Sequence, residues 1–128
     1  HEGQITYESL GLSKVLDLGE AWGEDTALPI PLGLDMVRRD LGETFATQMV
    51  DGLRESILYA FEHADEALEY AMKFSRGTDK ETCRRFVRMY VNEDTMDLGD
   101  EGQKALETLF GKAKDKGIIN DSPPLDMI

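Results

Sequence analysis

Residues 40–62 read DLGETFATQMVDGLRESILYAFE, and large apolar side chains return along them every four positions. The stripe consists of Phe45, Met49, Leu53, Ile57 and Phe61. Because an α-helix turns once in about 3.6 residues, this spacing places all of them on one helical face. Asp40 and Glu43 have the spacing of an N-terminal capping box, so we expect a helix to begin there.

Three further helices are expected downstream, each bounded by a capping or stopping residue. After a break at residues 62–65, Asp65 can cap the second helix, and Gly77 would end it. Thr78 and Glu81 have the spacing of a capping box, so Thr78 can cap the third helix. A polar loop at residues 92–99 then leads to a fourth helix, which Gly117 would end.

The first 39 residues differ from the rest, because they are rich in Gly and Pro and carry only short apolar runs. Residues 15–18 predict one strand and residues 30–37 predict a second. Between them, residues 20–25 predict a single helical turn around Trp22. Two strands on their own are only marginally stable. We therefore expect an α/β fold whose sheet is completed by residues outside this chain.

The composition excludes several classes of protein. A chain of 128 residues is the size of one domain, and its formal net charge of −12 with no basic stripe argues against nucleic-acid binding. The single cysteine, Cys83, excludes a disulfide framework. The longest uncharged stretch, residues 26–34, is too short to span a bilayer. We expect a cytoplasmic protein that binds neither nucleic acid nor membrane.

Several segments, in this order, carry a resemblance to a known family. They read HEGQITY at 1–7, VLDLGEAW at 15–22, LPIPLG at 28–33, RRDLG at 38–42 and YVNEDTMD at 90–97. Together they resemble the C-terminal half of the 1,4-dihydroxy-6-naphthoate synthases of the futalosine route to menaquinone. The resemblance implies a carbon–carbon lyase that converts cyclic dehypoxanthine futalosine to 1,4-dihydroxy-6-naphthoate. Chorismate dehydratase of the same pathway and a non-catalytic solute-binding protein of the same fold stay open as alternatives.

The resemblance also implies a type II periplasmic-binding-protein-like fold, in which two α/β lobes flank a cleft. This chain would be its mostly helical part, with about two short strands. Its divisions would be 1–28, the end of the second lobe with the HEGQ motif; 29–39, a crossover strand or hinge; 40–117, the helical part of the first lobe; and 118–128, a tail. Partners would be a small-molecule substrate and either the missing N-terminal half or a second copy of the chain.

His1 is the predicted catalytic residue, because the family's proposed general base is the histidine of the HEGQ motif. An imidazole suits this role, since its ordinary pKa of about 6.5 makes both protonation states accessible near neutral pH. Gly3 and Gln4 are predicted to bind substrate, and no metal or organic cofactor is implied. A copper site at the α-amine of His1 with His63 is a weaker alternative, because the sequence supplies no further ligand cluster.

Other candidate residues have more ordinary interpretations. Trp22 is more typical of a core than of an aromatic-binding cleft. Arg38 and Arg39 favour surface ion pairs with neighbouring acids over a substrate carboxylate. Cys83 lies among basic residues that would lower a thiol pKa, but no histidine lies near it in the sequence, so a half-buried structural position is favoured.

Overall fold

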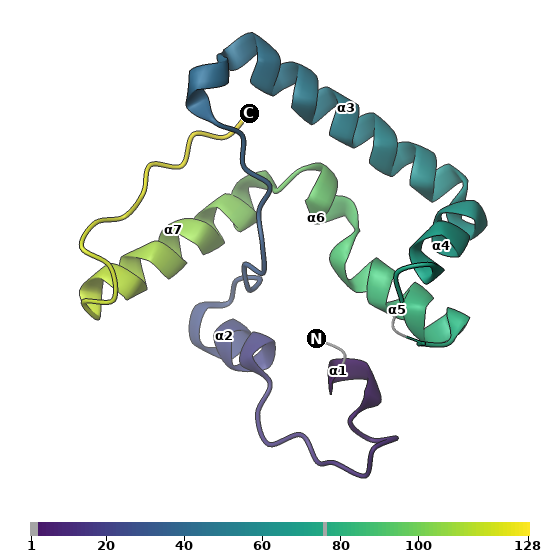
Figure 1. Ribbon diagram of the computed structural model, residues 1–128. Coiled ribbons are helices and arrows are strands. Elements are labelled where there is room, and N and C mark those ends of the chain that lie inside the picture. Colours follow the sequence, from purple (N-terminus) through teal and green to yellow (C-terminus); the bar gives the residue numbers. More distant parts are fainter. Residues whose placement is uncertain (1–2, 76) are drawn as a thin grey trace.

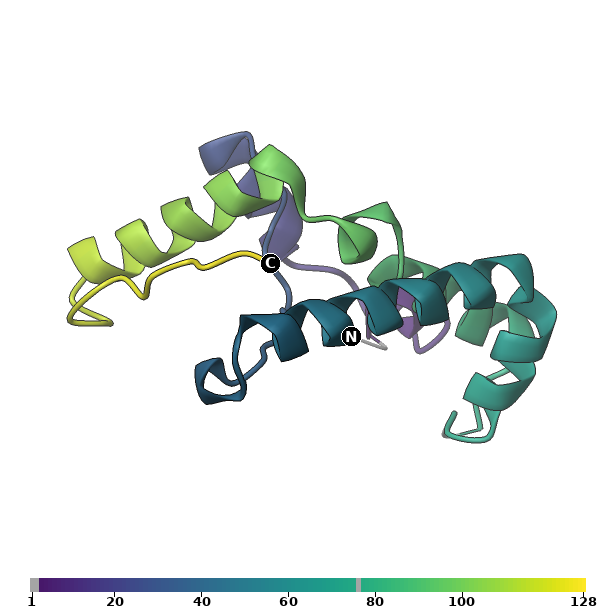
Figure 2. The same cartoon turned by 90° about the horizontal axis from the view of Figure 1, so that it is seen from above.

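The computed structural model describes residues 3–75 and 77–128, and every regular element within these two stretches is a helix. In chain order they are α1 (Gly3–Thr6), α2 (Leu18–Thr26), the 3₁₀ helix η1 (Arg39–Leu41), α3 (Glu43–Glu62), α4 (Ala64–Met72), α5 (Lys80–Tyr90), α6 (Glu93–Met96) and α7 (Gly99–Asp115). Figure 1 shows α1 and α2 on the side of the molecule away from α3, and an ion pair between Asp25 and Lys112, at 2.7 Å, joins α2 to α7. Figure 2 shows the helices spread out and not gathered around one centre.

The predicted α/β fold with two short strands is wrong for the residues that the structure describes. Residues 12–17 and 29–38 contain neither helix nor strand, although the backbone is extended at Asp17 and Arg38. A strand exists only as part of a hydrogen-bonded ladder with a neighbour. No such ladder forms within the described ranges, so these segments are extended loops. The two α/β lobes that the resemblance implied are likewise not found there.

Helix α2 confirms the turn expected around Trp22 and extends it to nine residues. It begins because Asp17 caps it, and it ends at Ala27, whose backbone is left-handed with φ of 56°. The Trp22 indole Nε1 donates a hydrogen bond to the carbonyl of Pro29 at 2.9 Å. That contact folds the following loop back onto the helix and leaves Trp22 half-buried.

Helix α3 confirms the helix that the apolar stripe predicts, but it begins at Glu43 and not at Asp40. The Asp40 carboxylate accepts two hydrogen bonds from the Arg38 guanidinium, at 2.9 and 2.6 Å, inside η1. It is therefore not free to cap the helix. Gly42 takes the N-cap position at φ 84°, with no side-chain hydrogen bond.

The boundaries of the next two helices differ in detail from those predicted. The break after α3 is confirmed, but Asp65 lies in the first turn of α4, and α4 ends at Met72, well before Gly77. Helix α5 is capped by Asp79 and not by Thr78. The Asp79 carboxylate accepts hydrogen bonds from the backbone N–H groups two and three positions onward, each at 3.0 Å. A carboxylate is among the strongest N-cap acceptors.

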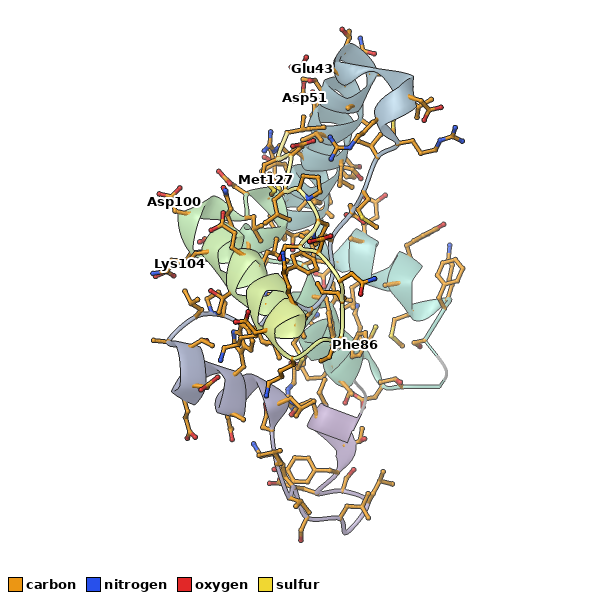
Figure 3. The ribbon with its side chains drawn as sticks, turned by 90° about the vertical axis from the view of Figure 1, so that its left-hand side faces the viewer. Glu43, Asp51, Phe86, Asp100, Lys104 and Met127 are labelled. Carbon is orange, nitrogen blue, oxygen red and sulfur yellow. The ribbon has the colours of Figure 1, made fainter. Side chains whose placement is uncertain are left out.

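The predicted polar loop at residues 92–99 contains the short helix α6, and α7 follows it. Gly117 ends α7 as predicted, with φ of 70° and its N–H bonded to the carbonyl of Lys114 at 2.8 Å. In Figure 3 Asp100 and Lys104 project outward from α7, and Met127 marks the end of the tail. The tail returns towards η1, where Asp126 forms an ion pair with Arg39.

The described residues bury few side chains. The buried apolar residues are Ala46, Ile57, Leu68, Cys83, Ala105 and Leu106. A folded monomer of 14.4 kDa exposes about 6,800 Å² by the usual size scaling. This chain exposes 10105 Å². The excess means that these helices do not enclose a core of ordinary size.

The apolar stripe of α3 is likewise only partly buried. Ile57 is buried, whereas Phe45 is 43% exposed and Met49 is 53% exposed. The helices that pack on one another most are neighbours along the chain, namely α4 with α5, and α3 with both α4 and η1. Among the described residues, most of the α3 stripe is left about half exposed. None of the described helices has both the length and the apolar character needed to cross a membrane.

Candidate active site at the HEGQ segment

The HEGQ segment at residues 1–4 is described only in its second half. His1, the predicted general base, lies outside the described residues, as does Glu2. Gly3 and Gln4 open α1, and both are exposed. A Cβ added at Gly3 would meet no other atom within 4 Å. Two of the predicted site residues are thus placed together at the surface, on one short helix.

Gln4 is held by a residue that lies far from it in the sequence. Its side-chain Nε2 donates a hydrogen bond to Asp17 Oδ2 at 2.6 Å. The other oxygen, Asp17 Oδ1, accepts from the backbone N–H of Gly19 at 2.8 Å and from that of Glu20 at 3.1 Å. One carboxylate therefore joins α1 to the N-terminus of α2.

The surroundings of Asp17 favour its ionised form. The hydrogen bond from Gln4 lowers the pKa of this carboxyl most, and the backbone N–H groups of Glu20 and Gly19 lower it further. Lys14 adds a weaker attraction, with its Nζ at 3.7 Å from Oδ2. Lys14 also donates to Glu20 at 2.8 Å, and that bond raises the pKa of the ammonium group. The Asp17 side chain is 12% exposed, although its hydrogen bonds with Gln4 and Glu20 lie at the exposed surface.

A shallow hollow of about 250 Å³ lies beside this carboxylate. It is lined by Lys14, Val15, Leu16, Asp17, Glu20, Ala21 and Glu24. Sites for small molecules usually enclose roughly 300–1,000 Å³, so this hollow is smaller than an ordinary small-molecule site and is not a closed cavity. A larger open depression of about 530 Å³ lies between α3, α5 and α6, but neither Gly3 nor Gln4 lines it.

The two arginines before α3 form surface ion pairs, as predicted. Arg38 binds Asp40, whereas Arg39 binds Asp126 of the tail and not one of its sequence neighbours. Both side chains are exposed. Their charges are satisfied by acids of this chain, so no anion is needed to explain them.

Cys83 and His63 have structural positions. Cys83 is buried in α5, deeper than the half-buried position expected. The His63 ring stacks on Tyr59 with the ring centroids 4.0 Å apart, and its Nδ1 lies 2.9 Å from the Tyr59 carbonyl. Within residues 3–75 and 77–128, no cluster of three or more acidic, histidine or cysteine side chains is placed to hold a metal ion.

Sequence reasoning missed Asp17, although part of its signal was present. Asp17 and Glu20 have the same capping-box spacing that pointed to Asp40, and they precede a helical turn. The contact with Gln4 has no local pattern, because it joins residues 13 positions apart across an irregular loop.

Comparison with known proteins settles the family. Residues 1–115 match the family model described as menaquinone biosynthesis. The chain belongs to the menaquinone biosynthesis family. The whole of the predicted tail, residues 118–128, lies outside this match.

Two relatives in this family carry the same name. The chain is 40% identical over 123 residues to the 1,4-dihydroxy-6-naphthoate synthase of Thermus thermophilus, and 36% identical over 119 residues to that of Streptomyces coelicolor. These matches cover 96% and 93% of this chain, but only 45% and 42% of the two relatives. The chain therefore spans less than half the length of these relatives, and it matches their C-terminal half.

A solved structure has the same arrangement of helices. The crystal structure of protein AF1704 from Archaeoglobus fulgidus matches this chain with a TM-score of 0.89 and 49% sequence identity. The match covers 93% of this chain and 45% of that protein. The helical arrangement of this chain is thus shared with part of a protein about twice as long.

Proposed function

We propose that this chain is the C-terminal part of a 1,4-dihydroxy-6-naphthoate synthase, a carbon–carbon lyase that converts cyclic dehypoxanthine futalosine to 1,4-dihydroxy-6-naphthoate. The similarity to two proteins of that name, along 96% and 93% of the chain, carries the proposal. Similarity of that extent includes both the N-terminal region and the helices, and so reaches well beyond one motif. We place the reaction in the cytoplasm, where a lone thiol such as Cys83 stays reduced.

His1 is the proposed general base of this reaction. An imidazole with a pKa of about 6.5 is largely unprotonated at neutral pH, so it can accept a proton. Removing a proton from the sugar-derived ring of the substrate starts the bond cleavage that releases the naphthoate. Gln4 offers an amide oxygen to the substrate, and Gly3 offers backbone at a position where an added Cβ would meet nothing within 4 Å beyond its chain neighbours and its own helix.

The remaining part of the enzyme is the proposed partner of the exposed apolar surface. The accessible area of 10105 Å² is about one and a half times that of an ordinary monomer of this mass. Large exposed apolar surfaces mark interfaces. An N-terminal part that covers the α3 stripe would also supply the wall that the 250 Å³ hollow lacks.

An activity assay tests the proposal directly. The 128-residue chain is assayed alone and as a fusion behind the N-terminal half of the Thermus thermophilus enzyme, with cyclic dehypoxanthine futalosine as substrate. We expect the fusion to form 1,4-dihydroxy-6-naphthoate and the chain alone to form none, because the chain lacks most of the substrate-binding surface. Mass spectrometry of the product provides the measurement.

His1→Ala in the fusion should lower kcat by about 10²- to 10⁴-fold, the usual contribution of a general base. His63→Ala is the matched control, because that ring stacks on Tyr59 and lies far along the chain from the HEGQ segment. It should leave turnover unchanged. A folded fusion without activity would refute the proposed function, and unchanged turnover in His1→Ala would remove His1 from the mechanism.

A further inference from the structure

Asp17 forms more hydrogen bonds than a helix cap requires. Its Oδ1 alone completes the cap of α2, by accepting from the N–H groups of Gly19 and Glu20. Its Oδ2 is left for the Gln4 amide, at 2.6 Å. Asp79 caps α5 with the same two-bond pattern, but its second oxygen accepts from Thr82 of its own helix. Asp17 therefore makes a long-range contact that its local role does not explain.

Helix α1 needs such a contact to hold its place. It has four residues and buries none of them, and a helix of that length does not form stably by itself. A carboxylate that accepts from an amide makes a strong, charge-assisted hydrogen bond. The side chains that face this carboxylate are Lys14 and Gln4, both donors, while Glu20 is paired with Lys14.

We infer that Asp17 is a positioning residue of the active site: by binding the Gln4 side chain, it fixes the Gly3–Gln4 end of the HEGQ motif against the start of α2. This inference rests on the proposed function, because only in that reaction does the placement of residue 1 matter. A general base must lie within hydrogen-bond reach of the proton that it removes. Asp17 acts on the reaction through Gln4 and touches no reacting atom.

Serine separates the two roles of Asp17. A serine hydroxyl caps a helix nearly as well as a carboxylate, but it is too short to reach Gln4 while it accepts from the start of α2. Asp17→Ser therefore keeps the cap and removes the contact. Asp79→Ser is the matched control, because it makes the same substitution at the same helix position without touching the HEGQ segment.

The first measurement uses the 128-residue chain alone. In an NMR titration from pH 2 to pH 7, the side-chain amide protons of Gln4 should shift with the ionisation of Asp17, below the usual carboxyl range. Asp17→Ser should abolish this response, and Asp79→Ser should leave it unchanged. A Gln4 amide that does not respond to Asp17 would overturn the inference, whatever the activity of the protein.

The second measurement uses the active fusion. Asp17→Ser should lower kcat about ten- to a hundredfold, the usual effect of a small misplacement of a catalytic group, and it should also raise KM, because Gln4 is a proposed substrate contact. Added to Gln4→Ala, it should cause no further loss, because Asp17 acts through Gln4. Asp79→Ser should leave both constants unchanged.

The outcomes separate this inference from the proposed function. An equal loss from Asp17→Ser with and without Gln4 would show that Asp17 acts only on overall stability, and the inference would fail. A fusion with no activity at all would instead refute the proposed function. The Gln4 titration would then still decide whether Asp17 holds the HEGQ segment.

Discussion

Asp17 and Asp79 are both helix N-caps, but the second carboxylate oxygen of each binds a different kind of partner. Both cap a helix through Oδ1, and in both the hydrogen bonds that they accept lower the carboxyl pKa. The largest contribution comes from Gln4 for Asp17 and from the Thr82 hydroxyl for Asp79. The first contact joins two segments, whereas the second stays inside one helix turn. The two residues therefore have the same local effect, but only Asp17 can affect the candidate site.

The lowered pKa values predict how helix content depends on pH. Since the pKa of Asp79 is lower in the folded chain than the unfolded value of about 3.9, its stabilising effect is fully present above that value. It is lost as the pH falls through the folded pKa. The magnitude of the negative ellipticity at 222 nm should therefore fall on acidification below about pH 4, as helix is lost. The fall should be smaller in Asp79→Asn.

Glu55→Gln, on the exposed surface of α3, is the control for this titration. It should leave the acid transition where it is in the unmodified chain. If Asp79→Asn and the unmodified chain lost ellipticity to the same extent over the same pH range, Asp79 would not contribute to the transition.

At the scale of elements, α7 contains two glycines in different surroundings. Gly102 is buried, and a Cβ there would lie 2.5 Å from Leu98 Cδ1, too close without a shift of that side chain. Gly111 has no neighbouring atom within 4 Å of the same position. Glycine in a helix interior costs about 0.5–1 kcal/mol relative to alanine. The same substitution should therefore have opposite effects at the two positions.

Gly111→Ala should raise the free energy of unfolding by about 0.5–1 kcal/mol, because only the backbone effect operates there. Gly102→Ala should lower the free energy of unfolding, because displacing Leu98 outweighs the gain in helix propensity. Urea titrations followed at 222 nm would measure both. A stabilising Gly102→Ala would show that Leu98 moves aside at little cost.

At the scale of the whole molecule, the described helices are formed but bury few apolar side chains. Leu106 and Ala105 are buried in α7, whereas Phe45 and Met49 of α3 are about half exposed. The matched relatives are more than twice as long as this chain. A chain with this much exposed apolar area is expected to bind other apolar surfaces.

We predict that the 128-residue chain self-associates and binds an apolar dye when it is alone, and that fusion to the Thermus thermophilus N-terminal half reduces both. Size-exclusion chromatography with light scattering measures the first property, and dye fluorescence measures the second. Met49→Gln should weaken self-association, whereas Glu55→Gln, on another face of α3, should not. A compact monomer that binds no dye would contradict the predicted partner surface.

The sequence by itself determined the longer helices and the family. The four-residue spacing from Phe45 to Phe61 predicts α3, and the glycine at 117 predicts the end of α7, because both signals act within a few turns of backbone. The segment motifs identified the family, since they are a property of the residues alone. The exact caps were less predictable, because adjacent acceptors such as Thr78 and Asp79 compete for one helix start, and because an arginine occupies the carboxylate of Asp40.

Only the tertiary structure decided what the extended segments and the candidate site became. Residues 15–18 and 30–37 have the composition of strands, but a strand needs a partner, and none of the described residues supplies one. Gln4 and Asp17 meet because the chain turns back between them, which no local pattern encodes. Side-chain periodicity specifies which face of a helix is apolar. Whether that face is covered depends on what else packs against it.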